Sequence, residues 1–210
     1  MKVLKAFLWV FGILGAISGV LYLTAFDVWT VPADDAMLAA SVEPAIRAGD
    51  ILVVSRSHSG ERGTLVRCAD PRPTNPGGWI VARVLAKPGE KIDIQGDNVN
   101  VDAKRNPSPY ACEPTTMKHP ETGQDVELSC SMEDTGEIKF GAYRAKTRVG
   151  VPVKATVEAG KVYLVSDNRY IHLDSRDYGQ IEPASCQHVL FRLWGKEGFG
   201  DAAHRFNVIW

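Results

Sequence analysis

Short runs in which apolar residues alternate with polar ones recur along the chain after residue 30. Such runs, when rich in β-branched or aromatic residues and separated by Gly, Pro, Asn or Asp, are typical of β-strands joined by turns. The segment 95–98 lies between two alternating runs and predicts a tight hairpin. We therefore expect a mainly β domain of paired antiparallel sheets. Its predicted strands cover residues 51–54, 79–85, 91–94, 98–101, 161–165 and 188–194.

Three further segments depart from this pattern. Residues 34–46 have a weak helical spacing, and Asp34 and Asp35 are placed to cap a short turn. Residues 103–158 are more polar and predict an excursion from the β domain rather than a separate domain. Near the end of the chain, residues 206–210 predict either a final strand or a second contact with a membrane.

The first residues of the chain predict a membrane anchor. Residues 6–26 form a run of 21 without a charge, which as a helix would be roughly 30 Å long, enough to cross the hydrocarbon core of a bilayer. Lys2 and Lys5 precede the run, and no basic residue follows until Arg47. This asymmetry predicts that residues 1–5 are cytoplasmic and residues 27–210 lie outside. A cleaved secretory signal is the alternative, but the run is longer than its apolar core would be.

The net charge and the cysteines bear on which ligands and which disulfides we expect. The net charge is −1 with no block of like charges, so we do not expect nucleic-acid binding. The chain has four cysteines, and a domain on the oxidising side of a membrane can form disulfides. We expect a bridge between Cys112 and Cys130 in the polar excursion. For Cys68 and Cys186, which lie beside apolar runs, we expect buried free thiols, with disulfide bonding as the alternative. No Cys–His group has metal-binding spacing, and we expect neither a metal nor a cofactor.

Three sequence boxes carry the candidate chemistry. The first is Ser41-x-x-Pro44-x-Ile46-x-x-Gly49-Asp50, and the second is Ala82-Arg-Val-Leu-Ala-Lys-Pro-Gly-Glu90. The third is Ser166-Asp-Asn-Arg-Tyr-Ile-His-Leu-Asp-Ser-Arg-x-Tyr-Gly179. In this order after a predicted anchor, they resemble the conserved boxes of type I signal peptidases. The resemblance covers residues 41–179 and is most specific in the third box.

The resemblance implies a membrane-anchored serine endopeptidase that removes leader peptides from exported proteins on the periplasmic face of the cytoplasmic membrane. It implies Ser41 as the nucleophile, on a stiff, exposed loop next to Pro44. A second register, in which residues 31–37 form the first box, would put Asp35 at the position of the serine, so we retain Ser41. Expected partners are preprotein leaders, the lipid bilayer and envelope or secretion proteins.

The chain departs from the family where the general base belongs. A serine hydroxyl needs an adjacent base, and in the family this is a lysine in the second box, where this chain has Ala82. The family's third box has a serine beside that lysine, where this chain has His172. Because an imidazole is a suitable base near neutral pH, we hypothesise a Ser41–His172 dyad with Asp174 as an orienting carboxylate. The alternative is an inactive protein that binds leader peptides or envelope partners.

The remaining site residues have supporting roles. We expect Asp174 and Arg176 to form an ion pair that braces the third box, with Arg83 as a further structural residue near the site. A leader would add as an extended strand beside the domain, with pockets for its alternate side chains. We expect Met37, Val42 and Leu85 to line this groove, although each is also suited to the core.

Overall fold

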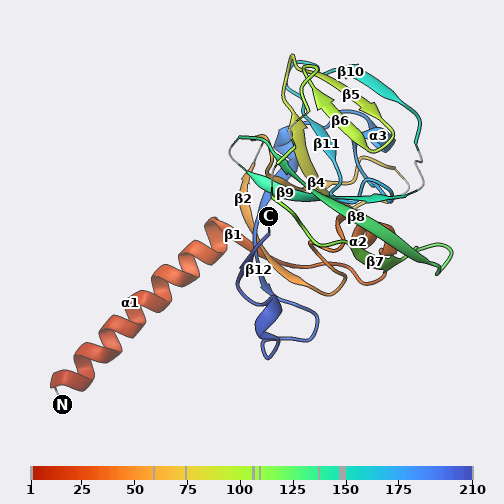
Figure 1. Ribbon diagram of the computed structural model, residues 1–210. Helices are drawn as coiled ribbons and strands as arrows, with labels where there is room; N and C mark the ends of the chain where they lie inside the picture. The colour runs from red at the N-terminus through yellow and green to blue at the C-terminus, as the bar shows by residue number, and fades with distance from the viewer. Residues whose placement is uncertain are drawn as a thin grey trace.

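The computed structural model describes residues 2–58, 60–73, 75–105, 107–108, 110–136, 138–146 and 150–209. In the N-terminal helix it describes only the backbone of residues 2–6, 8, 21 and 23. The chain forms one long helix followed by a β domain of three sheets (Figure 1). The mainly β, antiparallel prediction is therefore confirmed.

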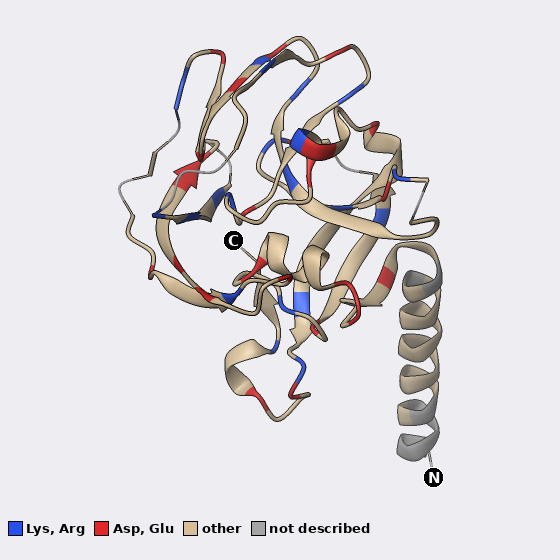
Figure 2. Cartoon of the chain, turned by 90° about the vertical axis from the view of Figure 1, so that its right-hand side faces the viewer, with Lys and Arg blue, Asp and Glu red and all other residues tan. Residues whose placement is uncertain are grey.

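Helix α1 (Lys2–Thr24) extends away from the β domain and leads directly into strand β1 (Phe26–Thr30) (Figure 1). Apolar side chains of α1 such as Trp9 and Phe11 are exposed, at 72% and 67%. The helix lies at the edge of the β domain in the side view and points away from it (Figure 2). The predicted helix at 6–26 is present with slightly different ends. Within the described residues, no helix meets the combined length and apolarity that a bilayer crossing requires.

The largest sheet has seven antiparallel strands in the order β1-β2-β12-β3-β4-β11, with β13 attached to β12. Strand β12, near the C-terminus, lies between β2 and β3, so it joins distant parts of the chain. Buried residues of this sheet form much of the main apolar core, in which residues such as Leu52, Val66 and Leu164 are fully buried. The bounds are β2 Ile51–His58, β3 Leu65–Ala69, β4 Trp79–Ala86, β11 Tyr163–Val165, β12 Cys186–Trp194 and β13 Asn207–Val208.

Two three-stranded sheets complete the domain. In the first, β10 (Val153–Thr156), β5 (Lys91–Gln95) and β6 (Asn98–Val101) lie side by side, and the predicted hairpin is confirmed by the pairing of Gln95 with Asn98. In the second, β7 (Thr115–Lys118), β8 (Asp125–Asp134) and β9 (Lys139–Ala145) pair in sequence order. The predicted polar excursion thus contains a sheet of its own. Its last part, β10, returns to the neighbouring sheet.

Short helices lie between the strands. They are α2 (Ala36–Val42), α3 (Ser175–Tyr178) and the 3₁₀ turns η1 (Pro183–Ser185) and η2 (Ala202–His204). The tail prediction of a final strand is confirmed by β13, which pairs with Phe191 and Arg192 of β12. Trp210, at the end of that prediction, lies outside the described residues.

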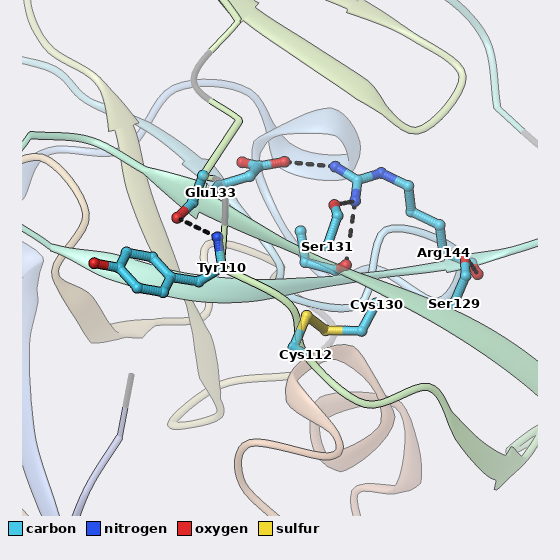
Figure 3. The surroundings of a disulfide bond; sticks show 9 residues. Tyr110, Cys112, Ser129, Cys130, Ser131, Glu133 and Arg144 are labelled. Atoms are coloured by element: carbon cyan, nitrogen blue, oxygen red, sulfur yellow. Dashed lines mark hydrogen bonds and ion pairs between the residues drawn. A yellow bond between two sulfur atoms is a disulfide. The ribbon is translucent and has the colours of Figure 1, made fainter.

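Both disulfides form between cysteines on neighbouring segments. The expected Cys112–Cys130 bridge is present and ties the chain before β7 to the middle of β8 (Figure 3). Beside it, the guanidinium of Arg144 pairs with Glu133 at 2.5 Å (Figure 3). The expectation of free thiols at Cys68 and Cys186 is wrong. These residues are directly opposite on β3 and β12 with Cα atoms 4.0 Å apart, and they form a buried disulfide.

Candidate active site

Ser41 lies in helix α2, near its C-terminal end. The Asp35 side chain caps the start of the helix by accepting a hydrogen bond of 2.9 Å from the N–H of Leu38, as is favourable at helix N-termini. This confirms the predicted cap and gives Asp35 a structural role. After the helix, Glu43 is extended, in keeping with its position before Pro44.

The expectation that Ser41 sits on an exposed loop is wrong. The apolar residues Leu38 and Val42 anchor α2 in the main core, and Ser41 is 0% exposed. Its hydroxyl donates a hydrogen bond of 2.8 Å to the carbonyl of Leu38. Within the described part of the chain, no titratable side chain hydrogen-bonds to this hydroxyl.

The second box forms strand β4. Ala82 is fully buried in the main core, so an apolar methyl group occupies the position where the family has its lysine. The next residue, Arg83, is also buried, and its guanidinium forms a two-point ion pair with Asp167 of the third box at 2.7 and 3.1 Å. A third donor of Arg83 reaches the carbonyl of Gly63 at 3.0 Å. Arg83 thus joins the second box to the third.

The third box meets the first at Asn168. The N–H of Asn168 donates to the carbonyl of Ser41 at 3.1 Å, and its side-chain amide donates to the carbonyl of Ala40 at 2.9 Å. The same stretch pairs with β9 of the excursion through a parallel bridge between Tyr143 and Asn168. The structure therefore brings all three boxes together around the end of α2.

His172 is held by a carboxylate other than the expected one. Its Nδ1 lies 2.9 Å from an oxygen of Asp177 in α3, and its side chain is 23% exposed. The same Asp177 oxygen accepts from the N–H of Asp174 at 3.0 Å, as part of a capping box. Asp177 was not singled out from the sequence, although an acidic residue three positions after Asp174 is the capping-box signal.

The predicted ion pair between Asp174 and Arg176 is confirmed, at 2.7 Å. Burial disfavours the charged form of Asp174, but Arg176 and the N–H of Ser166 outweigh it, so the pKa of this carboxyl lies below its ordinary value. Asp167 shows the reverse balance. Burial raises the pKa of Asp167 even though Arg83 acts against the change. The two carboxylates brace the third box in different electrostatic surroundings.

The three expected groove residues lie in separate apolar clusters. Val42 is 0% exposed in the main core, Leu85 belongs to the core beneath β5 and β6, and Met37 packs against a small cluster shared with the excursion. The structure does not gather them along one surface. Instead, a hollow of about 440 Å³ adjoins α2. Its lining includes Leu38 and two tryptophans, Trp29 and Trp79.

Ligand atoms of His172, Asp174 and Asp177 lie within 4.8 Å of one another, a spacing at which a metal can bind. Several of these atoms already have partners in the chain. Both oxygens of Asp174 accept from Arg176, and one oxygen of Asp177 serves His172 and the N–H of Asp174. The group is a structural cap of α3 in this arrangement.

Comparisons with known proteins agree on one family. The family model described as signal peptidase, peptidase S26, matches residues 5–192. Signal peptidase IB of Staphylococcus aureus strain Mu50 is 26% identical over 173 residues, which are 80% of this chain and 78% of that protein. The same protein of strain MRSA252 is 25% identical over the same length. A solved signal peptidase I from Enterococcus faecalis V583 has 17% identity and a TM-score of 0.38, and the match covers 63% of this chain and 97% of that one.

The antiparallel β domain thus gathers a serine box, an arginine-bearing strand and an Asp-Ser-Arg loop. The chain belongs to the signal peptidase family, peptidase S26. Its resemblance to type I signal peptidases is thereby confirmed.

Proposed function

We propose that this protein binds the leader peptides of exported preproteins at the cytoplasmic membrane and does not cleave them by serine–lysine chemistry. One observation carries the proposal: the Ser41 hydroxyl is buried and donates to the Leu38 carbonyl, and no titratable side chain among the described residues hydrogen-bonds to it. A serine hydroxyl without a base is a poor nucleophile, and the buried Ala82 has no group that can take a proton. Family membership supports leader peptides as the ligand class.

The hollow beside α2 is the proposed binding place. It is lined by Leu38, whose carbonyl receives the Ser41 hydroxyl, so it is adjacent to the serine box. Trp29 and Trp79 supply apolar surface, and the side chains of Asp34, Asp35 and Asn75 supply polar groups along the same lining. These features suit an extended peptide with small apolar side chains, held by main-chain hydrogen bonds.

We also propose that α1 anchors the protein in the cytoplasmic membrane, with residues 1–5 inside and the β domain on the periplasmic face. The uncharged run at 6–26 and the exposed apolar side chains of α1 support the anchor. Lys2 and Lys5 before the run support the orientation. The two disulfides support an oxidising compartment for the β domain.

Cleavage by a Ser41–His172 dyad is the second candidate function, and the contact between His172 and Asp177 favours it. A carboxylate on Nδ1 fixes the tautomer of an imidazole and leaves Nε2 to act as a base, as in serine hydrolases. For this reaction the Ser41 hydroxyl would have to leave the Leu38 carbonyl and meet the ring. The orienting residue would then be Asp177 instead of Asp174.

One experiment separates the two functions. The full-length protein in detergent is mixed with a fluorescently labelled leader peptide that includes the cleavage region; anisotropy measures binding, and mass spectrometry measures product. We expect saturable binding and no product from the wild type. Trp79→Ala should weaken binding because Trp79 lines the hollow. Absence of saturable binding would refute the proposed function.

The same assay tests the dyad through paired variants. If the wild type yields product, Ser41→Ala and His172→Ala should each abolish it. Ser129→Ala and His119→Ala are matched controls in the excursion, and they should leave product formation unchanged. Product that survives Ser41→Ala would exclude Ser41 as the nucleophile.

A further inference from the structure

Arg169 of the third box is completely buried, and part of its guanidinium group has no partner. One of its nitrogens, Nη2, donates to Glu133 of β8 at 2.7 Å. Its Nε and Nη1 are also buried, and neither has a hydrogen-bond partner among the described residues. A buried donor that lacks a partner is costly, and the cost is greater when the group is charged. An acceptor placed at these two atoms would remove that cost.

Glu133 does not supply that acceptor, because a second arginine shares its carboxylate. The other carboxylate oxygen of Glu133 accepts from the guanidinium of Arg144 in β9 at 2.5 Å (Figure 3). The remaining nitrogens of Arg144 donate to Ser131 and to two backbone carbonyls. Two guanidiniums therefore share one carboxylate, and of these two arginines it is Arg169 that keeps unpartnered nitrogens.

The neighbouring pair of Arg83 and Asp167 does not restore the charge balance. These two residues pair with each other, and the charges of Arg169 and Glu133 also act on the Asp167 carboxyl. When all are charged, this group has three guanidiniums (Arg83, Arg144 and Arg169) and two carboxylates (Glu133 and Asp167). The pKa of Arg144 lies below its ordinary value because of burial and then because of the charge of Arg169. The group therefore has one buried positive charge in excess.

The space beside this group limits the size of a ligand. A small cavity of about 10 Å³ adjoins Glu133, and its lining includes Thr135 and Lys104. A cavity of this volume accommodates about one water-sized particle. The surroundings of Glu133 therefore suit a small ion and are too tight for a large anion such as sulfate. Lys104 adds a further positive charge to the same surroundings.

We propose that Arg169 binds one small monovalent anion of the size of chloride, at the junction of the third box and the excursion. The anion would accept from Nε and Nη1 of Arg169 and would balance the excess charge. Glu133 and Arg144 belong to the excursion, and the N–H of Arg169 donates to the carbonyl of Tyr143 in β9 at 2.7 Å. Binding would therefore strengthen the attachment of the excursion to the third box. The inference rests neither on leader binding nor on the membrane anchor.

Thermal unfolding in chloride tests the site. The full-length protein in detergent is heated in sodium chloride or in sodium gluconate of the same ionic strength, because gluconate is too large for the site. A ligand that binds only the native state stabilises it. We expect Tm to rise saturably with chloride, by about 5–10 °C at a concentration 100 times the dissociation constant. Equal Tm values in the two salts would overturn the proposal, since a water molecule at Arg169 would not respond to the anion.

Two variants change the charge balance in opposite directions. Arg169→Met leaves two guanidiniums and two carboxylates, so the rise of Tm with chloride should disappear. Glu133→Gln leaves three guanidiniums and one carboxylate, so the same rise should occur at lower chloride concentrations than in the wild type. Lys118→Met removes a positive charge from an exposed ion pair and is the control, with the wild-type response expected. A wild-type response in Arg169→Met, or a weakened one in Glu133→Gln, would overturn the proposal.

A direct measurement needs no variant. Bromide has the charge of chloride and a similar size, and its anomalous X-ray scattering identifies it in a crystal. In wild-type crystals grown in sodium bromide, we expect an anomalous peak within hydrogen-bond distance of Nε and Nη1 of Arg169. Peaks confined to the protein surface, or no peak, would overturn the proposal even if Arg169→Met failed to fold.

Discussion

Arg83 and Asp167 form a buried two-point ion pair that connects the second sequence box to the third. Their side chains are 1% and 0% exposed, so neither charge can be hydrated if the other is removed. Arg83 also lies 4.5 Å from the ring centre of Phe140 in β9. Through these contacts Arg83 connects β4 to the third box and to the excursion.

Removal of one partner should destabilise the protein strongly. We expect Arg83→Met or Asp167→Leu to lower the free energy of unfolding by about 3–5 kcal/mol, because each leaves an unpaired buried charge. The measurement is urea unfolding of the full chain in detergent. Lys118→Met, in an exposed ion pair with Asp125 on the excursion, is the control and should have a much smaller effect. If Lys118→Met lowered the free energy of unfolding as much as Arg83→Met or Asp167→Leu did, the buried pair would have no special role in stability.

The two disulfides should differ in their contribution to stability. Cys68 and Cys186 are 118 residues apart, whereas Cys112 and Cys130 are 18 apart. By loop entropy, the longer link is expected to contribute about 4–5 kcal/mol and the shorter about 3 kcal/mol. Urea unfolding of the double variants Cys68→Ala/Cys186→Ala and Cys112→Ala/Cys130→Ala measures both. If Cys112→Ala/Cys130→Ala lowered the free energy of unfolding more than Cys68→Ala/Cys186→Ala did, the longer link would not be the more stabilising one.

The low pKa of Asp174 predicts a loss of stability in acid. Because the folded-state pKa lies below the ordinary value, the charged carboxylate stabilises the fold above an ordinary Asp pKa of about 3.9. That contribution is lost as the pH falls through the folded-state pKa. Urea midpoints of wild type and Asp174→Asn, compared between about pH 6 and pH 2, should converge toward the acid end. A constant difference would show that charge at Asp174 does not stabilise the fold.

Ala82→Lys tests whether the family's lysine fits this site. Ala82 is fully buried in the main core, so the longer side chain should destabilise the fold by about 1–3 kcal/mol from overpacking alone. Burial would depress the pKa of the new amine, so the cost should be largest at low pH and decrease as the pH rises. Unfolding free energies at several pH values check this. If the variant matched the wild type in stability at all pH values, a space for the lysine must exist beside Ser41.

The alternation of apolar and polar residues predicted several of the strands. It did not predict which residues distant in the sequence contact one another. Strand β8 has the same alternation, with apolar residues at Val126, Leu128, Cys130 and Met132, but it was not among the predicted strands because it lies in the stretch interpreted as a polar excursion. In β3 the buried Arg67 interrupts an apolar run, although its guanidinium lies over the rings of Trp29 and Trp79. Arginine in a core strand needs such partners, which sequence alone does not reveal.

The site was predictable in its parts and not in its geometry. The three boxes identified the segments that meet at α2, and the Asp174–Arg176 pair followed from local spacing. The burial of Ser41 depends on how α2 packs, and the opposition of Cys68 and Cys186 depends on which strand neighbours β3. The partner of His172 was set by the capping of α3, in which Asp177 is positioned by the Asp174 backbone.

The bridge between Tyr143 and Asn168 makes the excursion a structural support for the serine helix. Asn168 also bonds to the carbonyls of Ala40 and Ser41, so one residue couples β9 to α2. A protease cut or an insertion in β9 would therefore disturb the serine environment, although the two lie about a hundred residues apart in the chain. Engineered tags or reporters are better placed at the β7–β8 turn, for which the described residues show no backbone hydrogen bond to α2.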